Sequence, residues 1–158
     1  MLSPYVLHSK ISIPYYWQAG NFLGRFFAGL SKGILLASIC PKCQLKSLPP
    51  RQICIHCSLE SDALIEVQNA GRLRTFTHLN LDSAQKYRCK DECTFYSNLS
   101  SPVWGIVQFD TCDTGLVHFI NPGAIKKLSV GTRMKAVFKP VSERVGTILD
   151  IHYFDLDP

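Results

Sequence analysis

Long apolar runs and secretory signals are what this sequence of 158 residues most clearly lacks. Its longest apolar stretches are residues 22–30, which Gly24, Arg25 and Gly29 interrupt, and residues 34–39. A membrane-spanning helix needs about 20 consecutive apolar residues. The N-terminus also lacks a basic region followed by an apolar run and a small-residue cleavage site. We therefore expect a cytoplasmic protein that has no membrane association.

The sequence motifs of common catalytic sites are also missing. There is no Ser/His/Asp-type arrangement, no pair of catalytic carboxylates and no phosphate-binding loop, and the sequence has no internal repeat. A self-sufficient enzyme would have to use Cys89, Cys93 or Cys112 with a base such as His78 or His118. We name no catalytic residue and expect that the chain does not act as a catalyst alone.

Acidic side chains are fewer than basic ones, with 12 Asp and Glu against 17 Lys and Arg, which gives a formal net charge of +5. A basic excess can indicate nucleic-acid binding. A site of four thiolates and one Zn²⁺ would lower this charge to +3, and the basic residues are spread along the chain. The composition, 46% hydrophobic and 18% charged, is that of a globular protein with one modest core.

Two CxxC pairs are the strongest motif in the chain. Cys40 and Cys43 are separated by ten residues from Cys54 and Cys57. In a reducing compartment such pairs predict a metal site before a disulfide. Two pairs complete a tetrahedral shell of four sulfurs at about 2.3 Å from a zinc ion. Because this shell leaves no open position for water or substrate, we expect a structural role for the zinc.

Alternatives exist for the metal and for the other cysteines. A rubredoxin-type site would hold iron on a similar ligand set. His56 lies within the second pair, and we interpret it as a surface residue because four sulfurs already saturate the ion. Cys89 and Cys93 lie in the long polar segment 83–101 and are interpreted as loop thiols, with a second metal site or a redox pair as the alternative. Cys112 falls in a predicted hairpin turn.

The predicted elements are one aromatic helix followed by β-strands. Phe22, Phe26 and Leu30 recur at helical spacing after Asn21, which we expect to cap the helix. Gly33 suits the end of this helix. Alternating or continuous apolar patterns predict strands over residues 34–39, 64–68 continuing through 72–79, 103–109, 115–120, 133–138 and 146–154.

These elements predict a mainly β fold in three parts. Five strands with a short helix over residues 122–128, between the third and fourth strand, are the pattern of an OB-fold barrel. The predicted parts are an N-terminal arm with the aromatic helix over residues 1–33, a rubredoxin-like zinc ribbon over 34–62, and a five-stranded OB-fold domain over 63–158.

The combination resembles the acyl-CoA-associated zinc-ribbon OB-fold family, long labelled as a domain of unknown function. The resemblance extends from about Tyr15 to Phe154, and the long segment 83–101 departs from the family's compact form. The cysteine block with Pro49-Pro50-Arg51 is its most specific part. The other matching residues are Tyr15-Tyr16-Trp17, Gly24-Arg25-Phe26, Gly33-Ile34-Leu35, Gly71-Arg72-Leu73 and Asp150-Ile151-His152-Tyr153-Phe154.

The resemblance implies a small partner subunit of a thiolase-fold enzyme. Such subunits help to form acyltransferase or β-ketothiolase complexes and can lie along a CoA-thioester channel, while the thiolase subunit supplies the catalytic residues. The chain would then belong to a hetero-oligomer that shares an acyl-CoA ligand, with anaerobic degradation of aromatic compounds as one setting. The residues expected to contact CoA or the partner are Tyr15, Trp17, Phe22, Arg25, Phe26, Arg72 and Arg74, with Lys32, Arg133 and Lys135 as further cations for CoA phosphates.

Single-stranded nucleic-acid binding is the alternative function, because zinc ribbons and OB-folds both serve it. It would need a basic groove with exposed aromatic residues on the second and third barrel strands. The segments 103–109 and 116–120 contain no Lys or Arg, which counts against this alternative.

Overall fold

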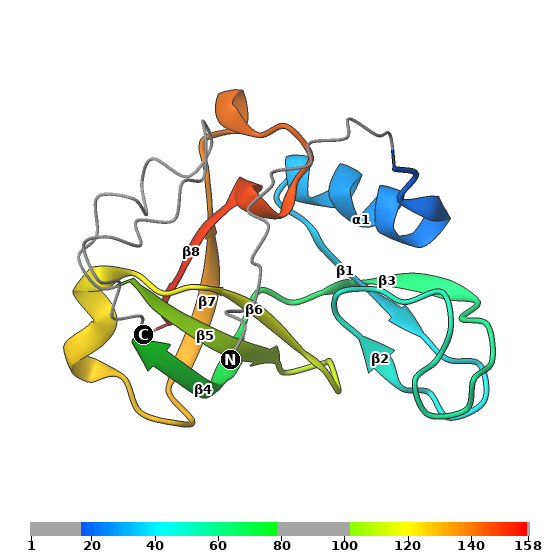
Figure 1. Cartoon of the computed structure of the whole chain (residues 1–158), viewed down its shortest axis with the longest axis horizontal. Coiled ribbons are helices and arrows are strands. Elements are labelled where there is room, and N and C mark those ends of the chain that lie inside the picture. Colours follow the sequence, from blue (N-terminus) through cyan, green and yellow to red (C-terminus); the bar gives the residue numbers. More distant parts are fainter. Residues whose placement is uncertain (1–16, 79–101, 158) are drawn as a thin grey trace, which may run out of the picture.

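The computed structural model describes residues 17–78 and 102–157. Two sheets and one α-helix make up this part of the chain (Figure 1). The predicted class is confirmed: a mainly β fold with an N-terminal helix, a four-cysteine ribbon and a five-stranded barrel sheet. The predictions for Tyr15, Cys89 and Cys93 lie outside the described residues. The elements are α1 (Gly20–Ser31), β1 (Leu35–Ile39), β2 (Lys46–Ser47), β3 (Ala63–Val67), β4 (Gly71–His78), β5 (Val103–Phe109), β6 (Gly115–Phe119), β7 (Arg133–Phe138) and β8 (Ile151–Leu156), with 3₁₀ turns η1 (Pro122–Lys127), η2 (Val141–Glu143) and η3 (Ile148–Asp150).

Helix α1 begins one residue before the predicted cap and ends as predicted. Asn21 is not its N-cap: Ala19 holds that position and makes no side-chain capping bond. At the other end, Gly33 has a φ of +78°. The Gly33 N–H donates to the carbonyl of Leu30 and the Ile34 N–H to that of Gly29, both at 2.9 Å. This pair of hydrogen bonds around a left-handed glycine ends the helix and directs the chain into β1.

The ribbon sheet has the strand order β2-β1-β3, with β1 antiparallel to both neighbours. We predicted that residues 64–68 continue into the first barrel strand, and the structure corrects this. Strand β3 pairs with β1, and β4 belongs to the other sheet. Asn69 lies between them, and its side chain bonds both the N–H and the carbonyl of Ala136 at 2.8 Å. The Asn69 amide thus takes the place of a strand partner where the chain leaves the ribbon.

The barrel sheet has the order β6-β5-β4-β7-β8. A parallel bridge between Ile120 and Phe154 joins the end of β6 to β8, so that the two outer strands meet. This order, with η1 between β6 and β7, is that of a five-stranded OB-type barrel. The Asn121 side chain accepts the Gly123 N–H at 3.0 Å and caps η1.

The last strand is shorter than predicted, because β8 begins only at Ile151. The preceding turn is organised by Asp150, whose side chain is fully buried. Its carboxylate accepts the backbone N–H groups of Val145, Gly146 and Thr147 at 2.8 to 3.3 Å. Three amides gathered on one carboxylate hold residues 145–147 in a turn, so this stretch cannot extend the strand.

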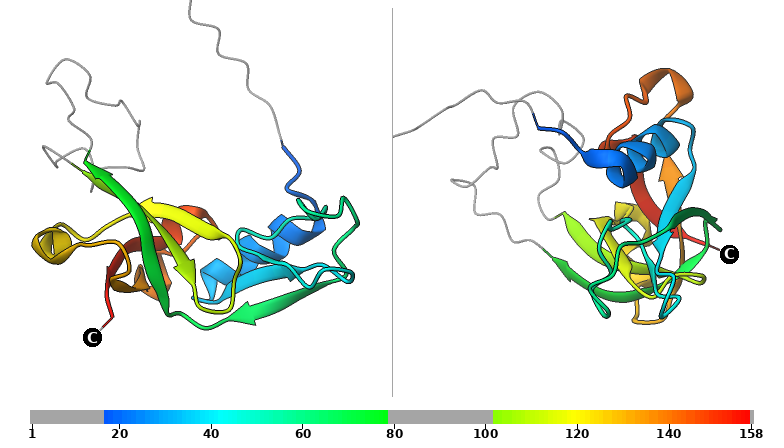
Figure 2. Two further views of the ribbon diagram at one scale, coloured as in Figure 1. Left: turned by 90° about the horizontal axis from the view of Figure 1, so that it is seen from below. Right: turned by 90° about the vertical axis from the view of Figure 1, so that its right-hand side faces the viewer.

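One hydrophobic core joins the helix, the ribbon and the barrel. Phe26 and Leu30 of α1 are 1% and 0% exposed and belong to the same buried cluster as Leu35, Leu73 and Phe154. Figure 2 shows the helix and the ribbon sheet at one end of the molecule and the barrel at the other. The cysteine pairs are therefore carried on a platform that the shared core fixes relative to the barrel.

Candidate metal centre

The two cysteine knuckles have the same backbone geometry. In the first, the Cys40 N–H donates to Leu45 and the Gln44 N–H donates back to the Cys40 carbonyl, both at 3.0 Å. In the second, the Cys54 N–H donates to the Leu59 carbonyl at 2.8 Å, and the Ser58 N–H donates to the Cys54 carbonyl at 3.0 Å. Gln44 and Ser58 both adopt the left-handed conformation, with φ of 58° and 56°. Each knuckle is thus a tight turn that points its two sulfurs to the same side.

The four sulfurs converge on one point. The Sγ atoms of Cys40 and Cys57 are 3.6 Å apart, as are those of Cys43 and Cys54, and those of Cys54 and Cys57 are 3.8 Å apart. All four Sγ atoms lie within 4.8 Å of one another. A tetrahedral site with bonds of about 2.3 Å has sulfur–sulfur edges of about 3.8 Å, whereas a disulfide has about 2.05 Å. The four cysteines are therefore positioned to bind one metal ion and are not disulfide-bonded.

Backbone amides prepare part of the site for negative charge. The N–H groups of Cys43 and Lys42 bond the Cys40 sulfur and lower the pKa of this thiol to about 6. The N–H groups of Cys57 and His56 lower the pKa of Cys54 in the same way, and the His56 nitrogen lies 3.4 Å from the Cys54 Sγ.

The pKa of the Cys57 thiol is shifted in the opposite direction. The neighbouring sulfur of Cys43, burial and the sulfur of Cys40 raise the pKa of Cys57 to about 12. Four thiolates at this spacing repel one another, so a bound cation is needed before all four lose their protons. This donor set fits a divalent, thiophilic ion such as zinc, which would join the two knuckles.

A turn of the barrel holds strand β2 of the ribbon in place. The β5–β6 turn contacts β2 and the residue that follows it, Leu48, which is fully buried. The Lys46 N–H donates to the Asp113 carboxylate and the Leu48 N–H to the Thr114 hydroxyl, both at 2.7 Å. Cys112 lies in this turn, 4% exposed, and burial raises the pKa of its thiol. Cys112 is therefore a packed thiol and not a reactive one.

The residues predicted to contact CoA or a partner are distributed over two elements. Trp17 is 65% exposed ahead of α1, Phe22 is half-buried and Arg25 is exposed. Phe26 is in the core and offers no surface to a ligand. Arg72 and Arg74 are exposed on β4, in the barrel sheet, where Arg74 donates to the Gln108 side chain at 2.6 Å and Arg72 to the carbonyl of Gly131 at 3.3 Å.

A groove lies between α1 and the ribbon strands. It has a volume of about 310 Å³. Two of the residues predicted to contact CoA or the partner, Arg25 and Lys32, line it. Its other lining residues were not predicted from the sequence. The spacing of Arg25, Ala28, Gly29 and Lys32 marks one helix face, but Glu66 reaches the groove only because β3 pairs with β1. The remaining lining residues are Ile34, which directly precedes β1, and Leu36 of β1.

Comparison with known proteins gives fold relatives only. No protein-family model matches the sequence, and no curated protein matches it. Among solved structures, a DUF35-family protein of unknown function from Sulfolobus solfataricus superposes with a TM-score of 0.61 at 18% identity, covering 87% of each chain. The Ltp2-ChsH2(DUF35) aldolase superposes with a TM-score of 0.54 at 16% identity, covering 77% of this chain and 86% of that one.

The chain has the fold of DUF35 structures. The name of the second structure joins ChsH2(DUF35) with Ltp2 in an aldolase. Within the described residues, no helix is both long enough and apolar enough to cross a membrane. In this chain the fold carries the four-cysteine centre on the ribbon, and α1 packs against β1 of the same ribbon.

Proposed function

We propose that this chain is a non-catalytic, zinc-binding subunit of a thiolase-type acyl-CoA acyltransferase, or β-ketothiolase, complex. Its role is to support assembly of the complex and binding of the CoA thioester. The observation that carries the proposal is the closed centre of four sulfurs in a fold shared with a DUF35 component of an enzyme assembly. A centre with all four tetrahedral positions taken by protein sulfur holds structure and does not activate a substrate.

The chemistry of the residues supports a scaffold role. Cys40, Cys43, Cys54 and Cys57 would hold the ion, which supplies two positive charges that offset the thiolates and join the knuckles. The shared core then holds α1 at a fixed place beside the ribbon. The partner subunit supplies the catalytic residues of the acyl transfer.

The exposed part of the predicted contact set is where the proposal places the partner and CoA. Trp17 and Phe22 offer aromatic surface at the start of α1, and Arg25 offers a guanidinium beside them. Arg72 and Arg74 offer cations on the barrel. An exposed Trp of this kind is a common anchor of protein interfaces. Anaerobic degradation of aromatic compounds is the setting that the sequence resemblance suggests for the complex.

The proposal is tested by expressing the chain together with the genes that neighbour it and identifying what stays bound through purification. We expect a thiolase-fold subunit, and one zinc for each copy of this chain. Purification of this chain alone, with full zinc and no thiolase-fold subunit, would remove the proposed function while leaving the metal centre standing. Salt-sensitive binding of single-stranded oligonucleotides would favour the alternative function instead.

A further inference from the structure

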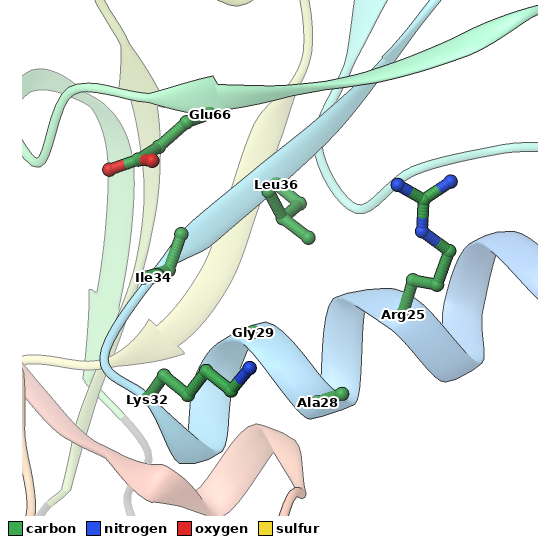
Figure 3. A pocket seen from close by; sticks show the side chains of 7 residues that line it. All are labelled: Arg25, Ala28, Gly29, Lys32, Ile34, Leu36 and Glu66. Atoms are coloured by element: carbon green, nitrogen blue, oxygen red, sulfur yellow. The ribbon is translucent and has the colours of Figure 1, made fainter.

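The groove beside α1 combines an apolar floor with charges on both walls. Its floor consists of Ala28 and Gly29 on the helix, Ile34 just before β1, and Leu36 on β1 (Figure 3). Gly29 is needed in this floor, because a Cβ there would meet the Ile34 carbonyl at 3.0 Å and the Leu36 side chain at 3.2 Å. With small residues at the middle of the helix face, the groove is open where a neighbouring side chain can enter.

The charges lie in a defined order around this floor. Arg25 and Lys32 project from α1 at the two ends of the groove, and Glu66 projects from β3 on the opposite wall (Figure 3). Seven residues of helix place the α-carbons of Arg25 and Lys32 about 10 Å apart. The ion pairs formed among the described residues all involve Arg133 or Lys135, so none of them neutralises these three charges.

This charge order decides between possible occupants. A second copy of α1 does not fit, because the helix carries Arg25 and no acidic residue, and like charges would face each other. A ligand with several phosphates would bring some of its charge against Glu66. The volume of about 310 Å³ is also at the lower end of small-molecule pockets, which leaves room for a few apolar side chains.

We propose that this groove receives an amphipathic segment of the partner subunit, with its apolar ridge on the Ala28–Gly29 floor. Two carboxylates of that segment, about 10 Å apart, pair with Arg25 and Lys32. A hydrogen-bond donor or a cation on its other edge pairs with Glu66. An α-helix with acidic residues seven positions apart has this spacing, so an acidic helix lying along α1 is the occupant. The inference rests on the proposed function, because it assigns the surface through which that partner binds.

The test compares two charge reversals of equal size in the zinc-loaded, full-length chain. Arg25→Glu/Lys32→Glu reverses the groove, and Lys126→Glu/Lys127→Glu reverses two exposed lysines on η1. The probe is the thiolase-fold subunit that co-purifies with the wild-type chain. We expect the groove variant to bind it at least about tenfold more weakly and the η1 variant to bind it as the wild type does. Unchanged zinc content and thermal midpoint show that both variants are folded.

A second variant tests the floor without changing charge. Ala28 is exposed on α1, so Ala28→Phe fills the groove without disturbing the core. We expect this variant to lose partner binding by a similar factor, while titration of coenzyme A into the isolated chain is the same as for the wild type. Loss of coenzyme A binding with partner binding retained would overturn the inference and make the groove a ligand site.

The outcomes separate this inference from the proposed function. If the wild-type chain binds a thiolase-fold subunit and both groove variants bind it equally well, the proposed function stands and the groove assignment is wrong. If no thiolase-fold subunit binds the wild-type chain, the proposed function fails and the groove assignment falls with it. If the η1 variant also binds the subunit more weakly, the loss in the groove variant reflects general electrostatic attraction. That result would also overturn the assignment of the groove.

Discussion

Asp113 and Lys46 exchange two hydrogen bonds and thereby fasten the zinc ribbon to the barrel. The Lys46 N–H donates to the Asp113 carboxylate at 2.7 Å, and the Asp113 N–H donates to the Lys46 carbonyl at 2.9 Å. The two residues are 67 positions apart in the sequence. Thr114 makes an equivalent pair of bonds with Leu48. Residues 113 and 114 of the turn between β5 and β6 therefore hold β2 in place, and we call this pair the clamp.

The clamp can be tested with Thr114→Val, which keeps the shape of the side chain and removes its hydroxyl. This hydroxyl accepts the Leu48 N–H at 2.7 Å and donates to the Leu48 carbonyl at 2.9 Å, next to a fully buried residue. A buried group left without its partner costs about 1–3 kcal/mol. We expect a loss of that size in the free energy of unfolding, measured with urea on the zinc-loaded protein. The same change at exposed Thr77 should alter it by less than about 0.5 kcal/mol.

Asp150 should be required as a carboxylate and not only as a hydrogen-bond acceptor. It is fully buried, and its two oxygens accept three backbone N–H groups. Asp150→Asn replaces one oxygen with a donor that faces other donors. We expect a loss of about 2–3 kcal/mol in the free energy of unfolding. Asp62→Asn, at an exposed carboxylate, is the control. An equal, small effect of both changes would contradict the role assigned to Asp150.

His118 should make the fold sensitive to acid. The ring is 3% exposed between Phe119 and Phe154, and burial lowers the pKa of His118 to about 4 from its ordinary 6.5. The unfolded chain therefore binds a proton more readily than the folded one between these values. The stability from neutral His118 is complete above about pH 6.5, is lost as the pH falls toward 4, and amounts to about 3 kcal/mol in all.

The measurement is the free energy of unfolding against pH for the wild type and for His118→Phe. Protonation of the cysteine ligands also weakens metal binding in acid, so only the difference between the two proteins isolates the histidine. We expect that difference to change by about 3 kcal/mol between pH 6.5 and 4. Parallel curves for the wild type and His118→Phe would show that His118 is not protonated on unfolding.

The cysteine ligands differ from Cys112 in what their loss should do. Cys40→Ser removes one of four ligands, so we expect the bound zinc to fall from one equivalent toward zero and the ribbon to unfold, because metal binding and folding are coupled. Cys112→Ser should keep the full equivalent of zinc. Metal content by mass spectrometry and protection of the amide of Cys54 from hydrogen exchange are the two readouts. Full zinc content in Cys40→Ser would exclude that cysteine as a ligand.

Local sequence patterns were sufficient to predict the cysteine centre and much of the barrel. The CxxC spacing identifies the four sulfurs because each pair is a short, local turn. Strands 103–109 and 133–138 have the bounds that the sequence predicts, and buried and less buried side chains alternate along the first of them. Gly33 ends α1 as predicted for the same reason, since its left-handed conformation is a local property.

The features that the sequence did not reveal depend on distant partners. Strand β3 looks like a continuation into β4, and only its pairing with β1 and the bonds of Asn69 to Ala136 separate the two strands. The buried carboxylate of Asp150 holds residues 145–147 in a turn, although their sequence pattern predicts a strand. The groove likewise forms only because β1 brings α1 and β3 together. Its charged residues come from both elements, so no single segment of the sequence reveals their arrangement.

The most direct test of the four-sulfur zinc centre is X-ray absorption spectroscopy at the zinc edge on the purified chain, together with its elemental analysis. We expect one zinc for each chain, surrounded by four sulfur atoms at about 2.3 Å. A folded protein without metal, or a zinc shell that contains nitrogen or oxygen ligands, would contradict it.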